Sequence, residues 1–335
     1  MNVKKISRIL VAIKDPEAKA LPALDKAVQL ARAFGAKLEL FHAITERLSL
    51  DAAWFQLNGL ADVEGKIIAG YQTKLDAIAN RLRGEGLAVA ATASADFPVY
   101  EAVVRRARDF KADLIVAECH AGRRAAPWLL HVTDWELLRT SPVPVLLVKN
   151  AKPYRKPVVL AALDPTHAFA KPAKLDAVIL QSATRFTEAL QGSLHAMHSF
   201  SPALIAAGPM NGAGATVAIQ ARAETQRLAR LEFARAVHGQ VARSRRHLVC
   251  DVPVAAIPAV ARETGASLVV MGAVSRSGLK RLLIGNTAER VLPQLSSDVL
   301  VVKPGAFVSH VAKEGRGIRI VATPSVPAYY QGPVT

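Results

Sequence analysis

The sequence predicts two α/β domains in tandem, each built on a parallel sheet, and three observations support this. The chain has 335 residues, which is too many for one ordinary core and enough for two. Hydrophobic residues make up 51% of it and aromatic residues only 5%, a composition typical of buried aliphatic strands packed against Ala-rich helices. The third observation is an internal repeat.

The repeat appears when residues 113–149 are laid on residues 267–303 at one constant offset without a gap. Self-similarity on the scale of a domain indicates duplication. The matching pieces are DLIVAE (113–118) with SLVVMG (267–272), VTDWELL (132–138) with NTAERVL (286–292), and VLLVK (145–149) with VLVVK (299–303).

Each half predicts the same order of elements. The opening strands end in an Asp-Pro pair, at Asp15 and Asp164, which breaks the strand and starts a loop. Helices with apolar residues at helical spacing follow, and Gly35 is suited to end the first of them. Strands that alternate with helices indicate right-handed crossovers, so each half should form a doubly wound, Rossmann-like sheet. The expected strands are 9–15, 37–44, 113–118 and 145–149, then 158–164, 193–200, 267–272 and 299–303; the expected helices are 21–35, 58–83 and 98–110, then 175–192, 215–241 and 253–265.

The Lys- and Pro-rich stretch AKPYRKP, residues 151–157, marks the expected domain boundary. It gives a first domain at residues 1–150 and a second at residues 151–305. Residues 306–335 contain Gly and Pro with little periodicity, so they are expected to form a mobile tail.

Composition and charge restrict the classes of partner and location. The formal net charge is +16, but the basic residues are scattered and no aromatic stacking platform accompanies them, so a solvated basic face is the favoured interpretation and nucleic acid is not expected as a partner. No apolar stretch approaches the roughly 18 to 20 residues that a membrane span needs, and the N-terminal apolar run is interpreted as a first strand rather than a signal peptide. Cys119 and Cys250 have no metal-ligand spacing, which favours a reduced cytoplasm.

Ligands of an open parallel sheet bind beyond the carboxyl ends of its strands, where helix N-termini offer unpaired N–H groups. In the second half these loops follow Asp164 and Gly272. Gly272 is followed thirteen residues later by Gly285, and then by Asn286 and Thr287. This spacing resembles the phosphate-binding signature of universal stress proteins, which is Gly, two residues, Gly, nine residues, Gly, and then Ser or Thr.

The resemblance covers roughly residues 5–305 and is greatest to the tandem-domain members of E type. It implies an adenine nucleotide alpha hydrolase-like fold with a five-stranded parallel sheet in each half, and a role in surviving stress without a defined reaction. In single-domain relatives two copies pair through their last strands. Here 145–149 and 299–303 are those strands, so the resemblance implies an internal pseudo-dimer of the two halves.

The phosphate signature departs from the family pattern at two positions. Ser275 replaces the second Gly, which restricts the backbone turn and adds a β-carbon, although its hydroxyl can donate a hydrogen bond. Asn286 replaces the Ser or Thr and is itself a competent donor. With Arg276, Ser277 and Thr287 nearby, an anion could still be held, so ATP with magnesium remains an alternative ligand. The candidate ligand-binding residues are Asp164, Gly272, Ser275, Arg276, Ser277, Gly285, Asn286 and Thr287.

The first half has lost the signature, because its equivalent positions are Glu118, Ala121, His131 and Val132. Glu118 would repel a phosphate where a backbone amide should meet it, so this half is not expected to bind ATP in the family's way. The resemblance places Asp15 and Asp164 near an adenine. For Asp15 an ordinary strand-ending turn is the favoured interpretation, and for Asp164 both interpretations stay open.

His42 and His198 end the second strands at matching positions, without a partner carboxylate at useful spacing, and are expected to be hydrogen-bonded core residues. No paired-carboxylate, metal or nucleophile pattern indicates a catalyst. The leading hypothesis is therefore a non-enzymatic stress-response protein that senses a ligand or contacts a partner, with any small-molecule site in the second half. An ATP-binding or weakly ATP-hydrolysing switch is the alternative, and a basic nucleic-acid-associated protein is the third.

Overall fold

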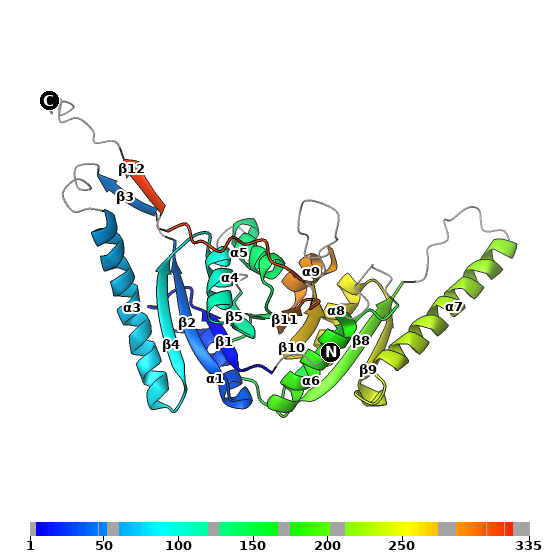
Figure 1. Cartoon of the computed structure of the whole chain (residues 1–335). Helices are drawn as coiled ribbons and strands as arrows, with labels where there is room; N and C mark the ends of the chain where they lie inside the picture. The colour runs from blue at the N-terminus through cyan, green and yellow to red at the C-terminus, as the bar shows by residue number, and fades with distance from the viewer. Residues whose placement is uncertain are drawn as a thin grey trace, which may run out of the picture.

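The computed structural model describes residues 5–45, 47–51, 60–119, 127–166, 175–201, 212–273, 286–305, 307–317 and 319–323. Strands and helices alternate in both halves, as the sequence predicts (Figure 1). The elements of the first half are β1 (Arg8–Ala12), α1 (Pro22–Phe34), β2 (Lys37–Ile44), β3 (Arg47–Asp51), α3 (Leu60–Gly84), β4 (Val89–Ala95), α4 (Val99–Asp109), β5 (Leu114–Glu118), α5 (Pro127–Thr140) and β6 (Val145–Val148). Those of the second are β7 (Val158–Leu163), α6 (Leu175–Ala189), β8 (Ser193–Phe200), α7 (Gly212–Ala236), the 3₁₀ turn η1 (Arg243–Arg245), β9 (Arg246–Cys250), α8 (Pro253–Glu263), β10 (Leu268–Gly272), α9 (Asn286–Val291), the 3₁₀ turn η2 (Leu292–Gln294), β11 (Asp298–Val302) and β12 (Arg319–Thr323).

Ten strands form one sheet in the order β4-β2-β1-β5-β6-β11-β10-β7-β8-β9. Within each half all neighbours are parallel, and the order along the sheet is third, second, first, fourth, fifth in both. The two halves meet where β6 pairs with β11 antiparallel, with Leu146 opposite Leu300. The last strands of the two halves therefore pair inside one chain, as the resemblance implies.

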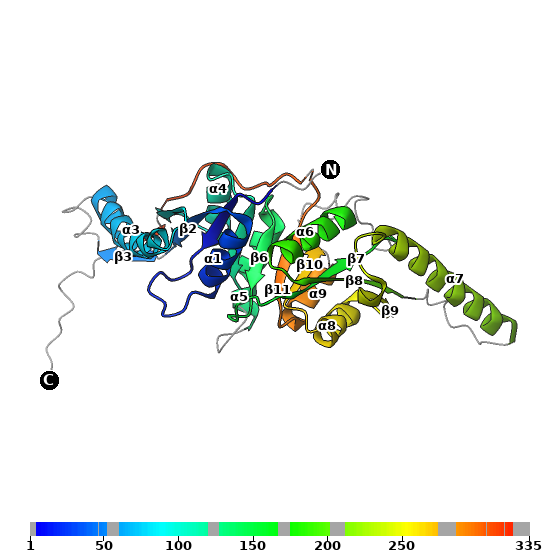
Figure 2. The ribbon, with the colours of Figure 1, turned by 90° about the horizontal axis from the view of Figure 1, so that it is seen from below.

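Alternation along the strands divides the core into one layer on each face of the sheet. Ile9 and Val11 of β1 face the layer that α1, α3, α6 and α7 cover, whereas Leu10 faces the layer under α4, α5, α8 and α9. The pairing of β6 with β11 is the seam between the two halves. Figure 2 shows α1 and α6 on one face of the sheet, on opposite sides of this seam. Burial on both faces explains why the central strands are continuous apolar runs.

The sequence prediction did not place the third strand of either half, β4 or β9. Both lie at the outer edges of the sheet, and their residues are less buried than those of the central strands. An edge strand buries less of its surface, so VAATASA and RHLVC lack the apolar signal of the others. The outer edge of β4 is protected by Gln72 of α3, whose side chain accepts a hydrogen bond from Ala93 N at 2.8 Å and donates one to Ala91 O at 3.1 Å.

A buried charge network joins the two halves around Asp298, at the start of β11, which is fully buried. Its Oδ2 lies 3.0 Å from Nζ of Lys26 of α1 and accepts the hydroxyl of Tyr154 at 2.7 Å. Its Oδ1 accepts the backbone N–H groups of Lys149 and Asn150 at 2.8 and 2.9 Å. The carboxylate of the second half is thus satisfied by donors from α1 and from the linker between the halves.

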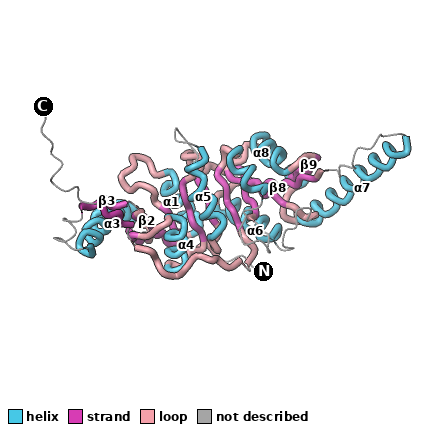
Figure 3. The backbone as a smooth tube through the Cα atoms, turned by 90° about the horizontal axis from the view of Figure 1, so that it is seen from above, coloured by secondary structure: helices cyan, strands magenta, loops and turns pink. Residues whose placement is uncertain are grey.

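The segment that follows β11 returns to the first half, which the expectation of a mobile tail does not account for. Residues 307–317 run across α4, and β12 pairs in parallel with β3, with Arg319 opposite Arg47 and Thr323 opposite Asp51 (Figure 1). Figure 3 shows β3 beside α3, at one end of the molecule. Val311 is buried in the core layer that includes α4. The segment is fixed by hydrogen bonds between its backbone and side chains of α4. Such bonds leave no periodic pattern in the sequence of the segment, so its glycines and its lack of periodicity were interpreted as a tail.

Within the described ranges, no helix combines the length and the apolar composition that a membrane span requires.

Candidate functional site

Asp164 lies directly after β7, where Pro165 breaks the strand. Its backbone N–H donates to Asp176 Oδ1 at 3.0 Å, and Thr166 Oγ1 donates to its Oδ1 at 3.3 Å. The residue is 6% exposed, and its second carboxylate oxygen, Oδ2, is buried and has no hydrogen-bond partner among the described residues. A buried carboxylate oxygen without a donor is costly, so this atom is an acceptor available to a bound molecule.

A cavity of about 70 Å³ opens at the carboxyl ends of β7 and β10. It is lined by Asp164, by Gly272 at the end of β10 and by Thr287 in the first turn of α9, together with Ser199 and Ile257. Three of the residues singled out in the sequence therefore meet around one cavity, although they are far apart in the chain.

Gly272 has a packing role that the sequence did not show. A β-carbon at this position would lie 2.6 Å from Leu175 Cδ2 and 3.2 Å from Ile179 Cδ1. The glycine therefore lets α6 pack closely on β10. Its presence is explained by this contact, whether or not its backbone also approaches a phosphate.

The remaining candidates of the second half are only partly described. Ser275, Arg276, Ser277 and Gly285 lie outside the described residues. Asn286 begins α9, but the placement of its side chain is not described. The anion-binding role of these residues stays a prediction.

The first half has a larger cavity at the equivalent place, of about 300 Å³. Glu118 and Asp134 line it, together with Lys14, His42 and Tyr100. Two carboxylates at this position repel a triphosphate. Of the other equivalent positions, Ala121 lies outside the described residues, and the side chains of His131 and Val132 in α5 are not described.

Asp15 is exposed, and its Oδ1 accepts a hydrogen bond from Glu17 N at 2.9 Å. This is the Asx turn that the strand-ending interpretation predicts. Asp15 and Asp164 thus hold equivalent places in the repeat, but only Asp164 is buried against a cavity.

His42 and His198 are core residues, as predicted. Both are buried, and Nδ1 of each hydrogen-bonds a carbonyl of the neighbouring strand or the residue after it, Ile13 O at 2.9 Å and Leu163 O at 3.2 Å. The sequence analysis did not identify two other histidines that contact each other: His195 Nδ1 of β8 lies 3.0 Å from His247 Nε2 of β9. Burial lowers the pKa of both imidazoles, which keeps the pair neutral at pH 7. Across the described parts of the chain, no cluster of three or more His, Cys, Asp or Glu side chains is suited to a metal ion.

Comparison with known proteins identifies the family. The model of the universal stress protein family matches residues 5–149 and again residues 173–303. Universal stress protein E of Escherichia coli K12 is 25% identical over 324 residues, an alignment that covers 90% of this chain and 96% of that protein. The universal stress protein E homolog of Haemophilus influenzae is 28% identical over 197 residues, which span 57% of this chain and 62% of the relative.

Solved structures show the same fold over almost the whole length. A Pseudomonas aeruginosa protein of unknown function superposes with a TM-score of 0.69 at 25% identity, covering 90% of this chain and 93% of that one. A universal stress protein from Archaeoglobus fulgidus superposes with a TM-score of 0.54 at 16% identity, covering 89% and 97%.

Proposed function

Because this chain belongs to the universal stress protein family, we propose that it serves the stress response by sensing a small molecule in the crevice of its second half. The crevice is the cavity around Asp164, Gly272 and Thr287. We propose no catalytic role, because the sequence carries no paired-carboxylate or nucleophile pattern and the described residues include no cluster of three or more His, Cys, Asp or Glu suited to a metal ion.

The observation that carries this proposal is the free acceptor of Asp164. Its Oδ2 is buried, and an unmet buried acceptor costs about 1–3 kcal/mol or more when it is charged. A ligand with an N–H or O–H donor removes that cost on binding. The neighbouring Ile257 and Met271 supply apolar walls, so the ligand class that fits is a small, flat molecule with a donor at one edge.

The alternative function is an ATP-binding or weakly ATP-hydrolysing switch. It is supported by the preserved glycine spacing, with Asp164 on the adenine side and Gly272, Ser275, Arg276, Ser277, Gly285, Asn286 and Thr287 on the phosphate side. ATP with magnesium would supply a hydrolysable phosphoanhydride to these residues. The cavity of about 70 Å³ is well below the roughly 300 Å³ of the smaller ligand pockets, so a whole nucleotide requires the crevice to widen. A single base requires less widening than a whole nucleotide, so the volume favours the smaller ligand.

Asp164→Asn tests the proposal, because the amide replaces one carboxylate acceptor by a donor at nearly constant volume. Adenine and adenosine serve as probes with an N–H donor at one edge, and ATP with magnesium is titrated separately by calorimetry. We expect a probe to raise the midpoint of thermal unfolding of the wild-type chain and to lose affinity about tenfold or more in the variant, as the loss of a charged hydrogen bond implies.

Asp15→Asn is the matched control, since Asp15 holds the equivalent position and is exposed. It should bind the probes as the wild type does. Binding of ATP with magnesium at one site, with no binding of the smaller probes, would establish the alternative. Equal binding by the wild type and Asp164→Asn would refute a site at this carboxylate.

A further inference from the structure

We propose that Lys303 is a covalent acceptor for small apolar aldehydes, which enter a cavity on the seam between the two halves and form an imine with its amine. This site is separate from the crevice around Asp164, and the proposal does not depend on the function proposed above.

The cavity has a volume of about 320 Å³ and is walled by both halves. The first half contributes Leu114 and Val143, and the second contributes Val178 and Phe186 of α6 and Leu300 of β11. Most of the lining is apolar, and the volume falls at the lower end of pockets that hold small ligands. The space therefore suits an apolar guest of a few carbon atoms.

Lys303 follows β11 directly and also lines this cavity. Its Nζ donates to the carbonyl of Arg139, near the end of α5, and lies 3.6 Å from the ring centroid of Phe307. Among the described side chains no carboxylate forms an ion pair with it. The side chain of Lys303 thus borders the cavity, and its amine is held by a carbonyl of α5 and by the ring of Phe307, which also lines the cavity.

Burial lowers the pKa of Lys303 to about 7. The charged groups that line the same cavity are Asp113, which accepts hydrogen bonds from Ser7 and Arg8, and Arg185 of α6. At pH 7 about half of the Lys303 amines carry no proton, whereas well under 1% do for a lysine with a pKa of about 10.4. The neutral amine is the form that attacks a carbonyl carbon.

The reaction balances without an oxidant or a reductant. The amine lone pair forms a bond to the aldehyde carbon, and the resulting carbinolamine loses its hydroxyl group and one nitrogen proton as water. The product is an imine, and hydrolysis by one water reverses it. Borohydride reduces the imine to a stable secondary amine, which makes the adduct measurable.

Lys149 of the first half is equivalent to Lys303 in the repeat and serves as an internal comparison. It also reaches across the seam, where its Nζ donates to Leu292 O at 2.7 Å and to Leu295 O. Burial lowers its pKa as well, against the charges of Cys119, Asp298 and Asp134. The cavity beside it measures only about 20 Å³. The two lysines share a position, but only Lys303 has room for an adduct.

The test uses the full chain with hexanal and cyanoborohydride at pH 7, followed by peptide mapping by mass spectrometry. We expect one hexyl group at Lys303, formed about tenfold or more faster than at Lys149 or at exposed lysines, with a pH profile whose midpoint lies near 7. Surface lysines should react appreciably only toward their own pKa of about 10.4.

Val178→Phe keeps the lysine and narrows the cavity, so it should lower labelling of Lys303 about tenfold while leaving Lys149 unchanged. Lys303→Met should remove the preferred site. Labelling spread evenly over the lysines of the wild-type chain, or labelling of Lys303 that Val178→Phe does not change, would overturn the proposal.

Discussion

Asp298 is a buried carboxylate whose four donors come from α1 and from the linker between the halves, so it acts as one contact point between the two halves. Burial, and the charge of Asp298 after it, raise the pKa of Tyr154 well above its usual value, which keeps the hydroxyl protonated as a donor. A buried ion pair adds little net stability when complete, but removing one member leaves its partner uncompensated.

Asp298→Asn should therefore lower the free energy of unfolding by about 3–5 kcal/mol, because Lys26 is left as a buried cation without a counter-charge. Urea denaturation followed by circular dichroism measures it. Asp109→Asn, at an exposed position on α4, should change it by less than about 0.5 kcal/mol. An Asp298→Asn variant within about 1 kcal/mol of the wild type would show that solvent reaches Lys26.

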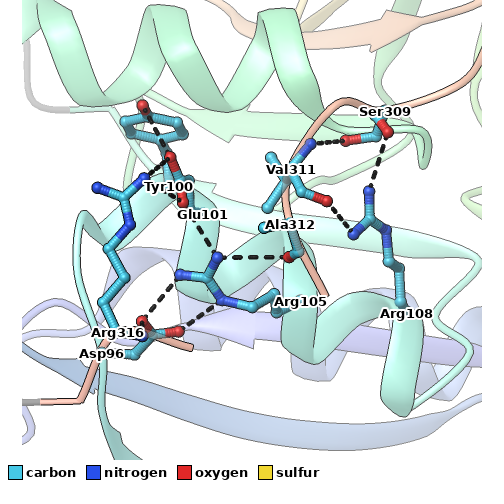
Figure 4. A network of polar contacts seen from close by, with 9 residues as sticks. All are labelled: Asp96, Tyr100, Glu101, Arg105, Arg108, Ser309, Val311, Ala312 and Arg316. Atoms are coloured by element: carbon cyan, nitrogen blue, oxygen red, sulfur yellow. Dashed lines mark hydrogen bonds and ion pairs between the residues drawn. The ribbon is translucent and has the colours of Figure 1, made fainter. Parts of the chain in front are cut away.

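At the scale of elements, α4 and the segment 307–317 form a clasp between the end of the second half and the first half. Asp96 holds Arg105 through two hydrogen bonds of 2.7 and 2.8 Å and accepts Arg316 N at 2.9 Å (Figure 4). Arg108 donates to Val311 O at 2.7 Å and to Ser309 O at 3.3 Å. Arg105 and Arg108 of the helix donate to backbone carbonyls of the crossing segment, and Arg316 of the segment donates in the other direction, to Asp96 and Glu101.

Truncation after Gly305 should lower the free energy of unfolding by about 2–4 kcal/mol, since it exposes the site of Val311 and removes the carbonyls that Arg108 bonds. Truncation after Gly317 keeps the clasp and removes β12. It should therefore lower the free energy of unfolding by less than half as much as truncation after Gly305. Amide hydrogen exchange should rise in α4 only for the shorter chain. Equal exchange in α4 for both truncations would show that the clasp contributes nothing there.

At the scale of the whole molecule, the two last-strand lysines cross the seam in opposite directions. Each donates to carbonyls at the end of the other half's last helical segment, where the helix dipole favours a cation. Burial nevertheless lowers the pKa of both amines. The seam is therefore sensitive to pH.

The free energy of unfolding should rise with pH above 7. The folded state releases the Lys303 proton near pH 7, whereas the unfolded chain keeps it up to about pH 10.4, so the unfolded state binds more protons between these values. The contribution is at most about 1.4 kcal/mol per pH unit. Urea titrations at pH 7, 8 and 9 should show a smaller rise for Lys303→Met, whereas the exposed Lys152→Met should follow the wild type. Parallel profiles for the wild type and Lys303→Met would contradict the shift.

The sequence predicted what repeats locally and missed what depends on contacts between the halves. The alternation of strands and helices predicted the parallel sheets. The rule that parallel strands end at one edge of a sheet predicted that Asp164, Gly272 and Thr287 lie close together. The repeat gave no indication that Asp298 is a contact point, because the equivalent residue of the first half is Pro144 and the two positions therefore do not match. The Lys303 cavity was equally invisible, since VLLVK and VLVVK look alike while their surroundings across the seam differ.

The antiparallel pairing of β6 with β11 has a consequence for how assembly depends on abundance. Two separate chains that pair through these strands dissociate on dilution, as mass action requires. Here a nine-residue link, residues 149–157, holds both partners together, and the effective concentration of one strand at the other is independent of how many copies are present. The paired state is therefore the same in a cell that holds few molecules as in one that has accumulated many.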